Sequence, residues 1–374
     1  MKKILFLTGT RADFGKIKSL ITVLEQHPDF EVYVFVTGMH LQQEYGYTLV
    51  EIERCKFTNV HTFYNHTHEA TMDLTLAKTI EGLSAYAKEI NPDMIVIHGD
   101  RVEALAGAIV GSLNNILVSH IEGGEISGTI DELIRHATSK MSHVHFVSNN
   151  EAKNRLIQMG ELSESVFAIG SPDVDIMFSD DLPPLETAKD YYEISFQKYA
   201  VAMFHPVTTE AKHMREYANL FVEALLKDAH NYIVIYPNND LGSGAIFEAY
   251  KRLENHPRFR IFPSLRFEYF LTLLKSAHFI IGNSSAGIRE APYYGLPIIN
   301  IGTRQQNRSV HADIVNVDYT LDSISAALKK IDTVTTQPIA NHYGSGNSAG
   351  LFLESLQKPA IWQLNHQKQF RDIV

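Results

Sequence analysis

The chain has 374 residues, of which 45% are hydrophobic and 20% are charged, so it can bury a sizeable core and is not disordered by composition. Its 33 Lys and Arg against 43 Asp and Glu give a net charge of −10, which argues against a general nucleic-acid or anionic-membrane surface. The single cysteine, Cys55, cannot form an internal disulfide, which fits a reducing compartment.

Short apolar runs alternate with helical patterns in the first half of the chain. The first run, residues 4–7, is too short for the apolar segment of a signal peptide, and no stretch approaches the roughly 18 apolar residues of a spanning helix. These features predict a cytoplasmic protein with no membrane contact. Apolar residues at helical spacing follow from Phe14 to Leu24. Further strands are expected at residues 31–36, 94–98, 116–121, 144–147 and 166–169.

The alternation breaks near residues 170–172, and the polar, proline-bearing stretch at 179–184 is typical of a linker. It then restarts, and strands are expected at residues 199–204, 232–236, 259–262, 279–281 and 298–301. Strands separated by helices indicate parallel sheets, so the sequence predicts two consecutive doubly wound α/β domains. Such sheets bind ligands beyond the carboxyl ends of their strands, and two such domains facing one another make a cleft.

A turn of small residues after the strand at 279–281 is a candidate phosphate site. Ser284 and Ser285 offer hydroxyls, and the start of the helix expected around residues 288–294 offers free N–H groups. The alternative is a capped helix start whose serines serve only the backbone. Arg11 and Arg304, at other strand ends, either meet a phosphate or lie on the surface. Glu290 either accepts bonds from ribose hydroxyls or belongs to a solvated helix face.

Acidic residues follow two strands of the first half. Asp100 comes just after the strand at 94–98, Glu122 follows the strand at 116–121, and Asp131 opens a helix shortly afterwards. If the two strands are neighbours, these carboxylates converge, as general acid–base chemistry requires. The alternatives are a helix cap for Asp131 and ion pairs with Arg101 or Arg135.

Histidines next to turns offer two further possibilities. A metal site formed by His98, Asp100, His120 and Glu122 is conceivable, but these residues lack tight ligand spacing, and no metal is predicted. His205 ends the first strand of the second half, where it could meet a phosphate or a leaving group. No Gly-x-Ser-x-Gly motif is present, which disfavours a serine nucleophile.

Five motifs follow one another along the chain: Gly9-Thr10-Arg11-Ala12-Asp13, His98-Gly99-Asp100-Arg101, His120-Ile121-Glu122-Gly123-Gly124-Glu125, Ser127-Gly128-Thr129-Ile130-Asp131, and Gly282-Asn283-Ser284-Ser285 with Arg289-Glu290. Together they resemble the UDP-N-acetylglucosamine 2-epimerase family, and the resemblance extends from residue 1 to about residue 310. It is strongest to the hydrolysing branch, which makes N-acetylmannosamine for sialic acid and includes bacterial capsule enzymes. Non-hydrolysing relatives carry Gln-His-Arg, part of a second nucleotide-sugar site, where this chain has Met39-His40-Leu41.

The resemblance implies a GT-B fold: two facing Rossmann-like, doubly wound domains with a C-terminal helix that crosses back onto the first. Residues 1–171 would form the N-terminal domain together with a crossing helix at 360–374, and residues 172–359 would form the UDP-binding domain. It also implies a homodimer or homotetramer.

The resemblance also implies site residues. The carboxylates Asp100, Glu122 and Asp131 match the catalytic acids, although which of them takes the substrate proton stays open. The residues that match the UDP-binding positions are Arg11, Arg101, His205, Asn238, Phe270, Ser284, Ser285, Glu290 and Arg304.

The implied reaction converts UDP-GlcNAc and water to N-acetylmannosamine and UDP. UDP is eliminated to give 2-acetamidoglucal, which is then hydrated, and in principle no metal or redox cofactor is needed. Two alternatives keep the fold: a hydrolysing 2-epimerase of UDP-N,N′-diacetylbacillosamine, from legionaminic acid synthesis, and a GT-B glycosyltransferase. A non-catalytic sensor of nucleotide sugars is a third.

Overall fold

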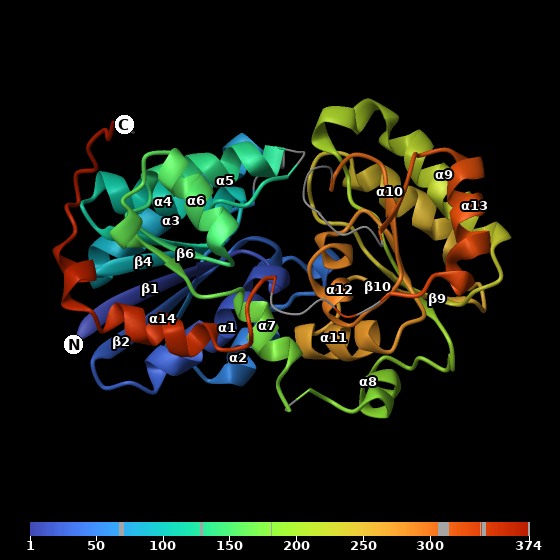
Figure 1. The fold of residues 1–374 in the computed structure, drawn as a ribbon, viewed down its shortest axis with the longest axis horizontal. Helices are drawn as coiled ribbons and strands as arrows, with labels where there is room; N and C mark the ends of the chain where they lie inside the picture. Colours follow the sequence, from blue (N-terminus) through green and yellow to red (C-terminus); the bar gives the residue numbers. More distant parts are fainter. Residues whose placement is uncertain are drawn as a thin grey trace. The chain divides into compact units, whose positions relative to one another are not determined.

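The computed structural model describes residues 1–66, 71–127, 130–180, 182–305, 314–336, 338 and 342–372. The chain forms two compact units, each built on one parallel sheet (Figure 1). The first unit comprises Met1–Glu125, Asp131–Ser179 and Asn341–Val374, and the second comprises Ile126–Ile130 and Asp180–Ala340. The first unit thus continues past residue 171, the expected boundary, because the short helix that follows packs on the first helix of the chain.

The first sheet has seven strands in the order β3-β2-β1-β4-β5-β6-β7. All the strands expected in this half are present, and one more, β3, joins the edge of the sheet. Its side chains are only partly buried, so it carries no continuous apolar run that would reveal it. The strands are β1 (Lys2–Thr8), β2 (Phe30–Val36), β3 (Asn59–Thr62), β4 (Met94–His98), β5 (Leu117–Ile121), β6 (Val144–Val147) and β7 (Val166–Ala168).

Successive side chains of β1 enter two different cores. Ile4 and Phe6 pack with the apolar face of the first helix, whereas Leu5 and Leu7 pack on the opposite side of the sheet. Both sides of this sheet are therefore covered, as a doubly wound fold requires. The helices of the unit are α1 (Arg11–Glu25), α2 (Leu49–Cys55), α3 (Met72–Ile90), α4 (Val102–Leu113), α5 (Ile130–Met141), α6 (Asn150–Gln158), α7 (Pro172–Met177) and α14 (Ser348–Leu356).

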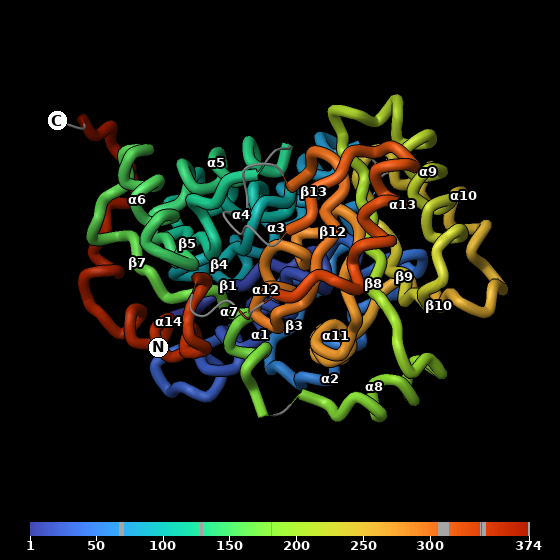
Figure 2. Tube along the Cα trace, turned by 45° about the vertical axis from the view of Figure 1, so that its right-hand side comes forward, coloured from blue at the N-terminus to red at the C-terminus, as the bar shows by residue number. Residues whose placement is uncertain are grey.

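The C-terminal part of the chain returns to the first unit, but its helix lies earlier than expected. Helix α14 lies beside α1 (Figures 1 and 2), and Phe352 packs against Phe6 and Phe146. The predicted helix at 360–374 is wrong: a short 3-10 turn covers Pro359–Gln363, residues 364–372 are irregular, and 373–374 lie outside the described residues. Residues 364–372 are polar apart from Leu364 and Phe370, so they offer no apolar helix face to bury.

The second sheet has six strands in the order β10-β9-β8-β11-β12-β13. The five strands expected here are present, and β13 adds a partly buried edge that the sequence did not reveal. The strands are β8 (Ala200–Met203), β9 (Tyr232–Ile235), β10 (Phe259–Phe262), β11 (Ile280–Gly282), β12 (Ile298–Ile301) and β13 (Ile314–Val317). The helices are α8 (Leu185–Tyr191), α9 (Met214–Lys227), α10 (Ser243–Tyr250), α11 (Phe267–Lys275), α12 (Glu290–Tyr293) and α13 (Leu321–Lys330).

Each sheet reverses its strand order once, between β1 and β4 in the first and between β8 and β11 in the second. Such reversals mark where doubly wound sheets bind ligands, at the carboxyl ends of the strands.

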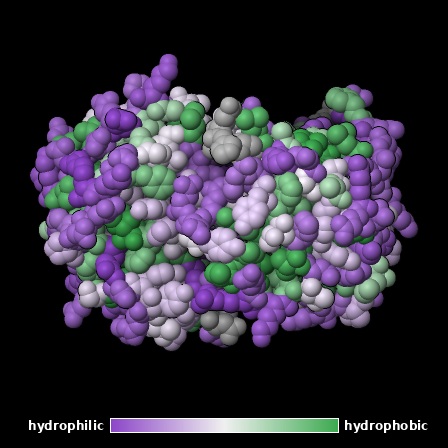
Figure 3. Space-filling model, turned by 180° about the vertical axis from the view of Figure 1, so that it is seen from behind, coloured by the Kyte–Doolittle hydropathy of each residue, from purple (hydrophilic) through white to green (hydrophobic). Residues whose placement is uncertain are grey.

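Hydrophilic side chains cover much of the face shown in Figure 3. Within the described ranges, no helix combines the length and the apolar character that crossing a membrane demands.

Candidate active site

The turn after β1 is held by a capping box that presents Arg11 at the start of α1. The Thr10 hydroxyl accepts a hydrogen bond from the Asp13 N–H at 3.2 Å, and the Asp13 carboxylate accepts one from the Thr10 N–H at 3.1 Å. Burial raises the pKa of Asp13, although hydrogen bonds from Thr8 and the turn oppose the rise. Burial, together with the charge of Arg11, lowers the pKa of His40 to about 3. The half-buried Arg11 therefore stands in a fixed polar turn.

Glu122 leaves β5 in the left-handed backbone conformation, with φ at 62°, which is uncommon for a glutamate. Its side chain is 6% exposed, and one carboxylate oxygen lies 3.3 Å from Lys16 Nζ and 3.2 Å from His98 Nε2. The Ser171 hydroxyl donates to the other oxygen. Lys16 also lies 3.3 Å from the buried Asp173. The buried Glu122 carboxylate therefore has a cation and a hydroxyl donor beside it inside the first unit, as a buried carboxylate requires.

Asp100 lies two residues beyond the end of β4 and forms an ion pair with Arg135 of α5. The Arg135 side chain is 2% exposed, whereas that of Asp100 is 25% exposed, so the arginine is enclosed and the carboxylate keeps contact with solvent. Arg135 also donates to the Glu125 carbonyl at 3.2 Å. The ion pair with Arg135, weighed above as the alternative for Asp100, is thus present, and it orients the carboxylate.

Asp100 and Glu122 follow neighbouring strands. His98 is in register with Ile121, and the Gly99 N–H donates to the Ile121 carbonyl at 3.0 Å, so the two carboxylates leave the sheet at adjacent points of its carboxyl edge. Asp131 lies in the first turn of α5, one helical turn before Arg135 and on the same side of the helix. Gly128 and Thr129, which precede it in its motif, lie outside the described residues.

Arg101 and His120 also lie at this edge of the sheet, and each contacts other groups of the protein. Arg101 Nε lies 3.5 Å from the carboxylate of the buried Glu103, at the start of α4. His120 is fully buried, with Nε2 2.7 Å from the Gly99 carbonyl and Nδ1 2.9 Å from the Ser139 hydroxyl. Burial lowers the pKa of His120 to about 3, so the ring is neutral at physiological pH. Both of its nitrogens are occupied by protein groups, which removes it from the conceivable metal site considered above.

In the second unit, Asn283 links three strand ends. The preceding Gly282 has φ at 136°, and a Cβ there would lie 1.9 Å from the Met203 carbonyl oxygen, so the approach of β11 to β8 requires glycine. The fully buried Asn283 side chain accepts from the His205 N–H at 2.6 Å and donates to the His205 carbonyl at 2.8 Å. Its own carbonyl accepts from Arg304 at 3.3 Å and from Gln305 at 2.9 Å, beyond β12.

The same cluster fixes the ring of His205. The Asn238 N–H donates to His205 Nδ1 at 3.1 Å, so this nitrogen carries the lone pair and Nε2 carries the proton of the neutral ring. The Asn238 amide in turn donates to Asp240 at 2.5 Å. His205 is therefore oriented as a hydrogen-bond donor through Nε2 at the carboxyl edge of the second sheet.

The serine turn differs from the expectation. Ser284 accepts from the Ala286 N–H at 3.2 Å and caps a 3-10 turn at Ser285–Gly287, and the helix expected around 288–294 is only α12, Glu290–Tyr293. Pro292 falls in the first turn, where a helix needs no N–H donor, and the helix stops at its C-cap, Tyr294, because Gly295 follows in the left-handed conformation, with φ at 63°. The turn, rather than a long helix, therefore presents N–H groups. Glu290 is 5% exposed, so it does not belong to a solvated helix face.

Asn283 thus contacts both His205 and Arg304, and His205 in turn contacts Asn238. Asn283 belongs to one of the five motifs, but its role was not predicted from the sequence. Phe270 lies in α11, is 5% exposed and belongs to the buried face of that helix. No sequence signal singled out Lys16 or Gln305, because their partners lie far away along the chain.

Comparisons with known proteins agree with the resemblance. A model of the UDP-N-acetylglucosamine 2-epimerase family matches residues 22–357. A "UDP-N-acetylglucosamine 2-epimerase" of Neisseria meningitidis is 47% identical over 100% of both chains. A "UDP-N,N′-diacetylbacillosamine 2-epimerase (hydrolyzing)" of Legionella pneumophila is 33% identical over 93% of this chain and 94% of its own. The "Polysialic acid biosynthesis protein P7" of Escherichia coli is 35% identical over 85% of this chain and 83% of its own.

The fold is also that of solved structures. The crystal structure of a UDP-GlcNAc 2-epimerase from Neisseria meningitidis, bound to UDP-GlcNAc, superposes with a TM-score of 0.79 at 19% identity and covers 95% of this chain and 99% of its own. This agreement and the two parallel sheets confirm the predicted GT-B fold class. The family match over most of the chain leads to one conclusion: this protein belongs to the UDP-N-acetylglucosamine 2-epimerase family.

Proposed function

We propose that this enzyme is a hydrolysing UDP-GlcNAc 2-epimerase, which converts UDP-GlcNAc and water to N-acetylmannosamine and UDP at the start of sialic acid biosynthesis. The observation that carries the proposal is the pair of carboxylates, Asp100 and Glu122, at adjacent strand ends, each with a cationic side chain beside it. The names of the relatives support the branch: one refers to polysialic acid, and another contains the word hydrolyzing.

The chemistry has two balanced steps. In the first, a base takes the C2 proton while the C1–O bond to UDP breaks, which gives 2-acetamidoglucal and UDP. In the second, water adds its hydroxyl to C1 and a proton enters C2 from the other face, which gives N-acetylmannosamine. Because the C2 hydrogen is weakly acidic, departure of UDP must run ahead and leave positive charge at C1. Carboxylates near the ring and donors on the diphosphate then favour the transition state.

In the first unit, Asp100, Glu122 and Asp131 are the groups proposed to exchange protons with the sugar. Two titrating groups are the minimum for the two proton transfers. Arg135 orients Asp100, and Lys16 and His98 both contact the Glu122 carboxylate, so both carboxylates have defined positions before substrate arrives. Such preorganisation lowers the cost of reaching the transition state.

In the second unit, the cluster around Asn283 is proposed to hold UDP. His205 offers Nε2–H, Arg304 brings positive charge, and the turn at Ser284 and Ser285 offers hydroxyl and N–H groups. These groups suit a diphosphate that gains negative charge as it leaves. Arg11 and Arg101 are proposed as further contacts to UDP, with Asn238, Phe270 and Glu290 at the nucleoside.

The test is proton NMR of UDP-GlcNAc incubated with the purified protein in heavy water. We expect free N-acetylmannosamine and UDP, with one deuterium at C2 of the sugar. Release of UDP-N-acetylmannosamine would assign a non-hydrolysing reaction. Product without deuterium at C2 would rule out elimination and re-addition.

A second candidate substrate is UDP-N,N′-diacetylbacillosamine, favoured by the Legionella relative at 33% identity. Parallel assays with the two donors, each without an acceptor, separate the candidates by the rate of UDP release. They also exclude a glycosyltransferase if UDP-GlcNAc is consumed with no acceptor present.

We further propose that the enzyme acts in the cytoplasm as a homodimer or homotetramer. Light scattering of the purified protein tests the oligomeric state.

A further inference from the structure

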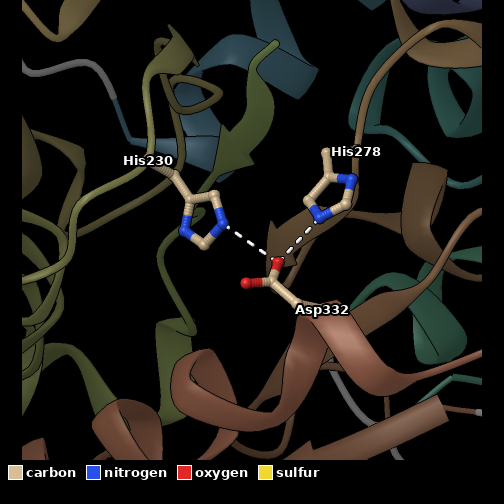
Figure 4. Close-up of side chains that lie close together, drawn as sticks. All are labelled: His230, His278 and Asp332. Carbon is tan, nitrogen blue, oxygen red and sulfur yellow. Dashed lines mark hydrogen bonds and ion pairs between the residues drawn. The ribbon is translucent and has the colours of Figure 1, made fainter.

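Two histidines and one aspartate converge at the edge of the second sheet opposite the His205 cluster. His230 precedes β9, His278 precedes β11, and Asp332 follows α13 in a 3-10 turn at Ile331–Thr333, so all three lie where the strands begin (Figure 4). One oxygen of Asp332 lies 3.1 Å from His230 Nε2 and 2.7 Å from His278 Nε2. Among the residues that the structure describes, no other group of three or more His, Cys, Asp or Glu side chains brings its potential metal-ligand atoms within 4.8 Å of one another.

The partners of His230 call for an extra positive charge. Its Nδ1 lies 2.7 Å from a carboxylate oxygen of Asp228, and its Nε2 faces Asp332. A neutral imidazole carries a proton on only one nitrogen, so one of these contacts would set a lone pair against a carboxylate oxygen. Either a second proton or a metal cation between Nε2 and Asp332 relieves that repulsion.

The spacing of the three atoms suits a metal. Zinc holds nitrogen and oxygen ligands at about 2.0–2.2 Å, which in a tetrahedron puts ligand atoms about 3.4 Å apart. The two contacts to Asp332 are 3.1 and 2.7 Å, so the side chains need to separate by less than about 1 Å to admit the ion. The side chains of His278 and Asp332 are 41% and 58% exposed, which leaves room for water as a fourth ligand.

His230 is also held as a metal ligand usually is. A zinc-bound histidine typically donates its other ring N–H to a carboxylate, which fixes the tautomer. Here Asp228 fills that place, and it is anchored by the Tyr232 hydroxyl at 2.6 Å and by the His230 N–H at 2.9 Å. The Arg258 guanidinium donates to the carbonyls of His230 at 3.1 Å and Leu226 at 2.9 Å, which fixes the loop.

We propose that His230, His278 and Asp332 form a structural site for a zinc-like divalent cation, with Asp228 as the carboxylate that positions His230. The bound cation would lie between the two Nε2 atoms and the Asp332 oxygen that both of them face. The site ties the segments before β9 and β11 to the end of α13. Because these residues lie at the opposite edge of the sheet from His205, the cation takes no part in the proposed reaction.

The test is titration calorimetry of the full-length protein, first treated with a chelator, with zinc chloride. We expect one strong equivalent per chain that His278→Gln and Asp332→Asn each weaken at least tenfold, and that Asp228→Asn weakens by about 10–100-fold. His27→Gln is the matched control, because His27 also lies near one aspartate, Asp29, at 3.8 Å but has no second histidine there. The affinity of the His27→Gln protein for zinc should equal that of the parent protein.

A second readout separates binding from folding. Saturating zinc should raise the melting temperature of the parent and of His27→Gln but not that of His278→Gln, whose circular dichroism without zinc should match the parent. Cobalt should give the visible absorption of a tetrahedral site in the parent and lose it in His278→Gln. Absence of a saturable equivalent, or equal affinity in all variants, would overturn the proposal and leave protonated His230 as the explanation of its two contacts. UDP release is measured in the same samples and should not depend on zinc, so this result stands apart from the proposed function.

Discussion

Asp100 forms an ion pair with Arg135, and these residues come from different elements, the loop after β4 and helix α5. The arginine is enclosed and the carboxylate is partly open to solvent. A buried guanidinium cannot lose its charge, so it keeps the carboxylate in one orientation. This pair also directs the Asp131 side of α5 towards the edge of the sheet that carries Asp100 and Glu122.

Replacing Asp100 with Asn should reduce kcat by about 100-fold or more, because a positioned acid–base group contributes about 10²–10⁴ to a rate. UDP affinity should change little, since the proposed nucleotide contacts of the second unit are intact. Steady-state UDP release and calorimetry with UDP measure the two effects. An Asp100→Asn enzyme with parental turnover would remove Asp100 from the mechanism.

Replacing Lys16 with Met should destabilise the protein by about 3–5 kcal/mol, because it leaves the buried carboxylates of Glu122 and Asp173 without their shared cation. Urea unfolding followed by circular dichroism measures the change. Lys88→Met, at an exposed position of α3, is the matched control and should shift the midpoint little. Equal midpoints for the two variants would contradict the buried network.

Replacing Asn283 with Ala should weaken UDP binding at least tenfold and cost about 2–4 kcal/mol of stability, because the N–H and carbonyl of His205 lose buried partners. Asn219→Ala, on the exposed face of α9, is the control. Calorimetry with UDP and urea unfolding report the two effects. Parental UDP affinity in Asn283→Ala would separate this cluster from the nucleotide.

Stability should fall as the pH drops from about 6.5 towards 3. Burial lowers the pKa of His40 and His120 to about 3 in the folded protein, so between these values the unfolded chain binds protons that the folded chain does not. By pH 5, each of the two histidines should lower the free energy of unfolding by about 1 kcal/mol or more. Urea midpoints at pH 7, 6 and 5 measure the slope, and a flat profile would mean that the two rings bind protons equally in the folded and unfolded states.

A second acid-sensitive group should act at lower pH. Burial favours the neutral form of Glu161, but His145 and Lys368 outweigh it and lower the pKa of Glu161 to about 2. The stabilisation from this group is therefore complete above about pH 4.5 and disappears as the pH falls to about 2. Glu161→Gln should flatten the loss of stability in this range, as followed by circular dichroism. An unchanged acid profile in Glu161→Gln would contradict the assignment.

The positions of the strands along the chain could be predicted where apolar runs are continuous, because a strand covered on both faces must be apolar throughout. The edge strands β3 and β13 were not predicted because each is only four residues long and is interrupted by polar residues, Asn59, His61 and Thr62 in β3 and Asn316 in β13. The returning helix was placed too late because the burial of Phe352 against Phe6 and Phe146 depends on contacts across the whole first unit. The helix after the serine turn is shorter than expected because the chain first forms a 3-10 turn at Ser285–Gly287 and Gly295 then ends the helix.

The sequence alone determined which polar groups end the strands, and hence the fold class and the family, since motif order along the chain is preserved whatever the packing. Only the tertiary structure decided what those groups touch: Lys16 beside Glu122, Arg135 beside Asp100, and Asn283 between His205 and Arg304. The physical reason is that charge balance and hydrogen bonding act over a few ångströms in space, between residues whose separation along the chain carries no periodic signal.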